Sequence, residues 1–189
     1  NLLGEEQSGH IKEVGFELYQ QMLEEAVAEI KGGEEYDDGH WSPQITVGTS
    51  VMIPEEYVPD LQVRLGLYRR LADLLEPSDI DGFGAELIDR FGPLPDEVQN
   101  LLKVVYIKAL CRKANVEKLE AGPKGVVVQF RNKTFSNPAS LVRMIGEQGS
   151  MAKIRPDQSV VFMRDWPTAE KRLAGAAVVM TQLARLAAA

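Results

Sequence analysis

The sequence predicts an α+β fold: a mixed, mostly antiparallel sheet of about five strands, packed with several helices and preceded by a long N-terminal helix. Apolar residues recur at intervals of three and four over several long stretches, which is the period of an amphipathic helix. In the second half, short segments alternate apolar and polar residues with a period of two, as half-buried strands do. With 189 residues, 44% of them apolar and 26% charged, the chain can bury a core of its own.

The first part of the chain predicts one long helix and then a linker. Ser8 stands where an N-cap is expected, and the glycine pair at 32–33 ends the pattern. The acidic, glycine-flanked segment 34–42 is only weakly apolar and predicts a linker. Within the helix, apolar residues recur at Ile11, Val14, Leu18, Met22 and Ala26. We therefore expect three parts, with bounds 1–33, 34–42 and 43–189.

The third part is expected to begin with a strand and to continue with three helices. Over residues 45–53 a β-branched set alternates with a second set until Pro54: the first is Ile45, Val47, Thr49, Val51 and Ile53, and the second is Thr46, Gly48, Ser50 and Met52. On the first of the helices, Arg64, Arg69 and Arg70 are expected to lie on the outer side. Gly92 is placed to end the second helix. Helical spacing covers residues 61–75, 80–91 and 96–115.

The remaining third returns to a period of two and adds two helices. Residues 116–119 and 126–130 predict a hairpin around a Gly-Pro turn. Asn137 and Pro138 begin a helix that runs to about residue 147. Segments 153–155 and 160–163 predict a second strand pair, and an alanine-rich helix follows from Pro167 onward.

Charge and cysteine content narrow the class of protein. The net charge is −7, but residues 1–60 hold 14 acidic residues against two basic, and residues 61–189 hold 14 acidic against 19 basic. The positive charge of residues 61–189 is too dilute for a phosphate-binding surface, which argues against an autonomous DNA-binding domain. The single cysteine, Cys111, lies in an apolar helical stretch, where we expect a buried residue, and it cannot form an internal disulfide. This agrees with a reducing compartment, and we expect a cytoplasmic protein. No apolar run approaches the ~20 residues that span a bilayer, so we expect no membrane insertion.

Common catalytic and metal-binding motifs are missing from the sequence. It contains no GxxxxGKS/T phosphate loop, no GxGxxG, no HExxH and no nucleophile elbow. His10 and His40 have no partners at zinc spacing and are expected at the surface. The acidic pairs at 5–6 and 37–38 are more typical of solvated charge than of a divalent-ion site. We expect no catalytic residue, no metal and no cofactor within this chain.

One candidate functional segment is Leu3-Gly4-Glu5-Glu6-Gln7-Ser8-Gly9, directly before the long helix. Its glycines allow the backbone to approach another surface closely. Gln7 can both donate and accept hydrogen bonds. The alternative interpretation is a flexible tail that ends in a serine cap.

A second candidate is Glu86-Leu87-Ile88-Asp89-Arg90-Phe91-Gly92. We expect Leu87, Ile88 and Phe91 to point inward on a helix, which places Glu86 and Asp89 together on the outer face. Two neighbouring carboxylates would then favour a cationic partner. In the alternative interpretation, Glu86 only pairs with Arg90 one turn away, a contact worth a few tenths of a kcal/mol.

Several segments, taken in order, resemble one family over essentially the whole chain. The combination closely resembles the C-terminal end of bacterial transcription-repair coupling factors (Mfd), although from Val116 onward the likeness lies in pattern more than in motif. The matching segments are residues 3–9, residues 14–19, Ile53-Pro54 with Tyr57-Val58-Pro59-Asp60, Arg64-Leu65 with Tyr68-Arg69-Arg70, and residues 86–92 with Leu94-Pro95.

This resemblance implies a parent protein that is an ATP-dependent translocase on double-stranded DNA. Such a parent displaces stalled RNA polymerase and recruits nucleotide excision repair through UvrA. Residues 1–9 are similar to the end of the translocation motif shared with the RecG helicase, with Gly4, Gln7 and Gly9 as motif residues. ATP and magnesium would be bound by the parent motor. Since the sequence begins without Met, we expect it to be one part of that longer protein.

The resemblance also implies a docking role for residues 43–189, which look like the family's C-terminal regulatory domain. That domain clamps onto an N-terminal module similar to UvrB and hides the surface that UvrA uses. Glu86 and Asp89, beside Arg90, match acidic positions of the docking face, and arginines of the UvrB-like module are the implied partners. Two alternatives remain open. One is a small α+β enzyme with an undetected site, and the other is a nucleic-acid-binding module using Arg64, Arg69, Arg70 and Arg90.

Overall fold

The computed structural model describes residues 21–32 and 41–189. Within them lies a five-stranded sheet with the order β1-β2-β3-β5-β4. The β1–β2 pair is parallel, and the other three pairs are antiparallel. The predicted α+β class with a mostly antiparallel sheet is therefore confirmed. The strands are β1 (Gln44–Thr46), β2 (Val116–Gly122), β3 (Gly125–Phe130), β4 (Ala152–Ile154) and β5 (Val160–Met163).

The strand predicted over residues 45–53 is wrong in its length. Only Gln44–Thr46 pairs with the sheet, where Ile45 lies opposite Leu119. Gly48 has a φ of 62°, a left-handed conformation that turns the chain away from the ladder. Farther along, the amide of Ile53 donates to the hydroxyl of Tyr68 at 2.6 Å. The alternating burial therefore continues to Ile53, but the backbone at Ile53 donates a hydrogen bond to a side chain instead of pairing with a neighbouring strand.

The helices after residue 60 follow the predicted segments closely. The side chain of Asp60 accepts the amide of Val63 at the start of the first helix, which is N-capping. Gly92 and Asn115 end the next two helices with φ values of 96° and 60°. These helices are α2 (Leu61–Ala72), α3 (Pro77–Phe91), α4 (Asp96–Ala114), α5 (Pro138–Glu147) and α6 (Ala169–Ala188), with short 3-10 turns η1 (Arg131–Lys133) and η2 (Gly149–Met151).

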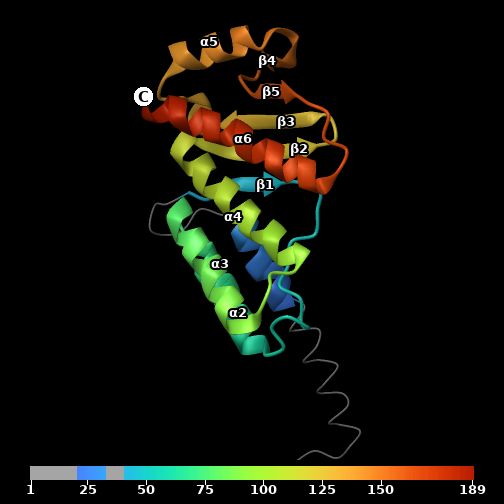
Figure 1. Ribbon diagram of the computed structural model, residues 1–189. Helices are drawn as coiled ribbons and strands as arrows, with labels where there is room; N and C mark the ends of the chain where they lie inside the picture. Colours follow the sequence, from blue (N-terminus) through green and yellow to red (C-terminus); the bar gives the residue numbers. More distant parts are fainter. Residues whose placement is uncertain (1–20, 33–40) are drawn as a thin grey trace, which may run out of the picture.

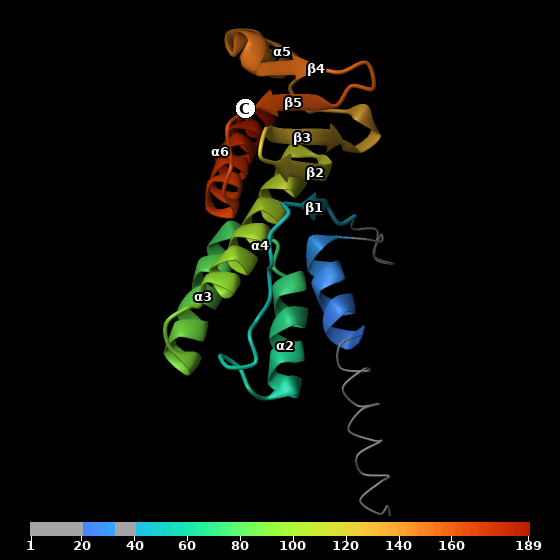
Figure 2. The same cartoon turned by 90° about the vertical axis from the view of Figure 1, so that its right-hand side faces the viewer.

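The helices lie on one face of the sheet and at the two ends of the molecule. Helices α4 and α6 pack against each other and against the sheet, where they bury its apolar face. Helices α2 and α3 lie at one end, with α3 packed on α4, and α5 lies beside β4 at the other end (Figures 1 and 2). The buried core joins α4, β2 and β5 through residues such as Leu101, Leu119 and Phe162.

A helical segment at residues 21–31 packs on this domain. Ile30 is fully buried in the core, and the Nζ of Lys108 on α4 donates to the carbonyl of Glu29 at 2.7 Å. Gly32 follows with a φ of 83°, and any Cβ there would collide with the backbone of Pro43. The predicted N-terminal helix is confirmed over this stretch. Its earlier residues and most of the predicted linker lie outside the described residues, so the three-part division stays a prediction.

Candidate protein-docking site

Helix α3 presents the predicted acidic residues on its outer side. Glu86, Asp89 and Arg90 lie away from the buried stripe of the helix. The expectation that Ile88 points inward is wrong, because Ile88 lies at the edge of that stripe and is 50% exposed. The stripe itself recurs at three and four, as helix burial requires: Ile80, Phe83, Gly84 and Leu87.

Glu86 forms an ion cluster with two arginines. Its carboxylate accepts two hydrogen bonds of 2.7 Å from the guanidinium of Arg70 on α2, and one of 3.0 Å from Arg90. The fork of Arg70 matches a carboxylate in this bidentate geometry, and its Cζ also lies 4.8 Å from the ring centre of Phe83. The hydrogen bonds from Arg70, and then from Arg90, lower the pKa of Glu86 to about 2. Glu86 therefore stays ionised and links α2 to α3.

Asp89 lies one turn along the same face but has a different environment. It is exposed, and it makes no hydrogen bond or ion pair with any residue in the described part of the chain. The predicted pair of Glu86 with Arg90 is present, so one of the two outer carboxylates is neutralised internally. The other keeps its charge available to a partner.

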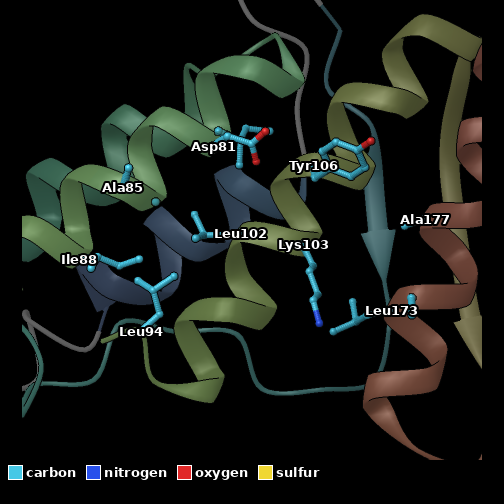
Figure 3. A pocket seen from close by; sticks show the side chains of 12 residues that line it. Asp81, Ala85, Ile88, Leu94, Leu102, Lys103, Tyr106, Leu173 and Ala177 are labelled. Atoms are coloured by element: carbon cyan, nitrogen blue, oxygen red, sulfur yellow. The ribbon is translucent and has the colours of Figure 1, made fainter. Parts of the chain in front are cut away.

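An apolar groove begins on the neighbouring side of α3. It has a volume of ≈540 Å³, within the ~300–1,000 Å³ of typical ligand clefts, and it lies among α3, α4 and α6 (Figure 3). Three polar side chains line it, Asp81, Lys103 and Tyr106, and none of them has a hydrogen-bond or ion-pair partner among the described residues. The exposed Ile88 joins the groove to the acidic face. The remaining lining is apolar or small, including Gly84, Ala85, Leu94, Leu102 and Ala177.

The arginines proposed for nucleic-acid binding are mostly occupied. The expectation that Arg64 lies outside is wrong, since it is 3% exposed and donates to the carbonyl of Val58 at 2.7 Å. Its burial has a physical reason, because the backbone carbonyls of the segment before α2 lie away from water and need a hydrogen-bond donor. Arg70 and Arg90 bind Glu86, which leaves Arg69 on the surface. The nucleic-acid alternative loses most of its proposed footprint.

Other expected features cannot be placed. Gly4, Gln7 and Gly9 of the first candidate segment, and both histidines, lie outside the described residues.

Within residues 21–32 and 41–189, no group of three or more His, Cys, Asp or Glu is placed to hold a metal ion. No helix in the same ranges has the length and apolar character needed to cross a membrane. The expectation that Cys111 is buried is confirmed.

Comparison with known proteins identifies the family. The profile of the TRCF domain matches residues 47–141, half of the chain. The chain belongs to the TRCF domain family. It is 44% identical over 164 residues to the transcription-repair-coupling factor of Rickettsia conorii. It is 33% identical over 175 residues to that of Escherichia coli. These alignments cover 87% and 91% of this chain, but only 14% and 15% of the two relatives.

A solved structure shares the TRCF domain's architecture. The crystal structure of a C-terminal domain of transcription-repair coupling factor matches with a TM-score of 0.66. The match covers 77% of this chain and 93% of the other, at 19% sequence identity. At this identity the likeness shows the fold alone.

Sequence reasoning missed the most strongly bound partner in the candidate site of this TRCF domain. Arg70 lies 16 residues before Glu86, beyond the reach of any helical spacing rule. A signal was present in the predicted outward position of Arg70 on the preceding helix. Only the folded arrangement of α2 and α3 brings that side chain to Glu86 and to the ring of Phe83.

Proposed function

We propose that this TRCF domain is a non-catalytic docking domain that keeps its parent protein autoinhibited. It binds the parent's N-terminal UvrB-like module and masks the surface that UvrA uses. The parent is an ATP-dependent translocase on double-stranded DNA that acts on RNA polymerase in the cytoplasm, and its motor binds ATP and magnesium. Residues 1–9, with Gly4, Gln7 and Gly9, belong to the end of the translocation motif of that motor.

The exposed and unpaired Asp89, beside the ion cluster of Glu86, is the observation that carries this proposal. The buried stripe of α3 and its packing on α4 fix the helix face that bears Asp89 before any partner arrives, and Arg70 and Arg90 neutralise the neighbouring Glu86. An arginine of the partner can then pair with Asp89 without first breaking a contact. Arg90 limits the negative charge of this face and favours a partner of matched geometry over an arbitrary cation.

The surface also suits a contact that has to open again. Exposed ion pairs are worth only ~0–1 kcal/mol each and are screened by salt. The groove next to Ile88 adds apolar area that a partner can cover. A modest, partly polar contact of this kind can be displaced by a competitor such as UvrA. The names of the relatives, transcription-repair-coupling factors, support this setting.

The test is charge reversal of Asp89 in the full-length parent. We expect Asp89→Lys to raise both UvrA binding and basal ATPase activity, because a lysine repels the partner's arginine. Asp165→Lys is the matched control, since Asp165 is also exposed and lies in the loop before α6. The control should change neither quantity. Unchanged UvrA binding and ATPase activity in Asp89→Lys would refute the docking role.

Glu86→Lys, alone or combined with Asp89→Lys, needs a separate measurement, because Glu86 also joins α2 to α3. Binding of the purified UvrB-like module to this chain, measured together with the urea midpoint of the chain, separates a loss of docking from a loss of stability. Asp89→Lys alone should weaken that binding while the urea midpoint of the chain stays unchanged. Glu86→Lys should lower both.

A further inference from the structure

A second groove lies at the end of the molecule opposite α3. It runs between α5 and the strands β4 and β5, where Figures 1 and 2 show α5 lying beside β4. Its volume is ≈370 Å³, again within the range of ligand clefts. Most of the lining is apolar, with Phe130, Phe135, Leu141, Val142, Ile154 and Val160.

Large apolar side chains remain exposed around this groove. Val142 on α5 is 59% exposed and Ile154 on β4 is 46% exposed, and both line the cavity. Met151, directly before β4, is also largely exposed. Grouped exposed apolar residues beside a cavity are typical of a surface that a partner covers. The volume and the apolar lining of the cavity suit a bulky apolar side chain.

The chain segment that supplies most of the groove carries a charge opposite to that of the whole chain. Residues 131–159 hold five basic side chains against two acidic ones, Glu147 and Asp157, on a chain whose net charge is −7. Asp157 is already used locally, because it accepts hydrogen bonds from the amide and hydroxyl of Ser159 at 2.9 and 2.6 Å. Glu117 lies with Asp157 in an adjoining recess of ≈150 Å³. The five basic residues of the segment are Arg131, Lys133, Arg143, Lys153 and Arg155. Lys133 lines the groove itself, whereas the guanidinium of Arg131 lies over the ring of Trp41.

Two polar residues that line the groove are held in an unfavourable backbone conformation. Lys133 and Gln158 have φ values of 53° and 69°, in the left-handed region. That region disfavours residues with a Cβ, whereas glycine adopts it without strain. Local hydrogen bonds hold both turns, from the Thr134 amide to Arg131 and from the Gln158 amide to Arg155. Both long side chains are thus present at some cost in stability, and such outliers are typical of binding sites.

We infer that the groove between α5 and β4–β5 is a docking site for an acidic peptide segment that carries a bulky apolar side chain. The apolar side chain enters the cavity beside Val142 and Ile154. A flanking carboxylate of the peptide meets Lys133, the basic residue that lines the groove. A nucleic acid would use the positive charge but would leave the apolar cavity unfilled, so the observations favour a peptide. The site is independent of the docking face on α3, and its distance from that face lets both be occupied together.

The test uses a short fluorescein-labelled peptide in which glutamates flank a central Leu-Phe pair. We expect its anisotropy to rise when the chain is added, and the affinity to fall as salt is raised. In the amide NMR spectrum of the chain, the shifts should concentrate at Lys133, Val142 and Ile154. Two control peptides should bind at least about tenfold more weakly, a difference of ~1.4 kcal/mol. One has serines at the centre, and the other has lysines in place of the glutamates.

Variants of the chain test whether the groove residues themselves bind the peptide. Val142→Glu should abolish binding of the peptide, and Val178→Glu, at an equally exposed valine on α6, should leave it unchanged. Lys133→Gly should raise the urea midpoint, because glycine relieves the left-handed strain, while it weakens binding of the peptide.

Several outcomes would overturn the inference. The first is the absence of amide shifts at the groove at millimolar peptide. Full binding by Val142→Glu, or an unchanged midpoint with full binding in Lys133→Gly, would do the same. Tighter binding of a single-stranded DNA oligonucleotide to the same residues would assign the surface to nucleic acid instead.

Discussion

The buried Lys108 predicts how the free energy of unfolding of the chain changes with pH. It lies on α4, only 2% exposed, and its Nζ donates to the carbonyl of Glu29 at the end of the helix at residues 21–31. Burial lowers its pKa from 10.5 to about 7. The charge of Arg112 lowers it further, while that of Glu29 acts in the opposite direction. A charged ammonium is thus costly at this place, although a helix C-terminus favours a donor.

The sign of the resulting pH dependence follows from the proton balance. In the unfolded chain the lysine keeps its ordinary pKa of ~10.4. Between pH 7 and that value, the unfolded state binds more protons than the folded state. The free energy of unfolding therefore rises with pH across this window. Integrated from pH 7 to pH 9, the shift of Lys108 contributes about 2 kcal/mol.

Replacing Lys108 with Met tests this directly. Met has a similar length and no titratable group, so the variant should lose the rise between pH 7 and pH 9. It removes one of two donors to the Glu29 carbonyl, which still accepts from the amide of Gly32 at 3.2 Å, and the lost hydrogen bond costs about 0.5–1.5 kcal/mol at every pH. Urea unfolding followed by circular dichroism at pH 7, 8 and 9 gives the difference between wild type and variant. That difference should grow by about 2 kcal/mol over the window.

Lys103→Met is the matched control, since Lys103 lies on the same helix but only half-buried. It should follow the wild-type pH profile. Parallel pH profiles for wild type and Lys108→Met would refute the claim that Lys108 is buried against residue 29 in solution.

Three further predictions concern the core. Gly175→Ala should cost about 1–3 kcal/mol and shift the fluorescence of Trp166, because a Cβ at position 175 would overlap the buried ring. Burial raises the pKa of the Cys111 thiol, so a thiol reagent such as DTNB should fail to modify the folded chain and should react in urea. Tyr68→Phe should lower the free energy of unfolding by about 1–3 kcal/mol, because it leaves the buried amide of Ile53 without an acceptor; a urea titration measures this.

Most elements of the fold could be predicted because local signals and burial agree. Gly92 and Asn137 both lie where the sequence places helix boundaries, since capping and φ preferences act within one turn. The segment after Ile45 shows where this fails. A period of two records alternating burial, but strand pairing also requires a neighbouring edge, and Gly48 turns the backbone away from it.

The candidate site could be predicted only in part, for the same reason. Helical spacing places Glu86 and Asp89 on one face, and that spacing is local. The burial of Arg64 and the reach of Arg70 to Glu86 depend on how α2 packs, which no period reveals. The buried Lys108 was missed as well, although a lysine between Ile107 and Ala109 in a helix apolar on most sides is itself a signal.

The two carboxylates that the sequence treats as a pair thus have different roles. Glu86 is bound by Arg70 and Arg90, so its charge is largely consumed in joining α2 to α3. Asp89 has no such partner among the described residues, so its charge is free for recognition. A partner that pairs with Asp89 meets a helix face already held by the buried stripe of α3, so less conformational entropy is lost on docking than on a mobile surface. The internal ion cluster supports the proposed contact by neutralising Glu86, so that Asp89 is the carboxylate left to select the partner's arginine.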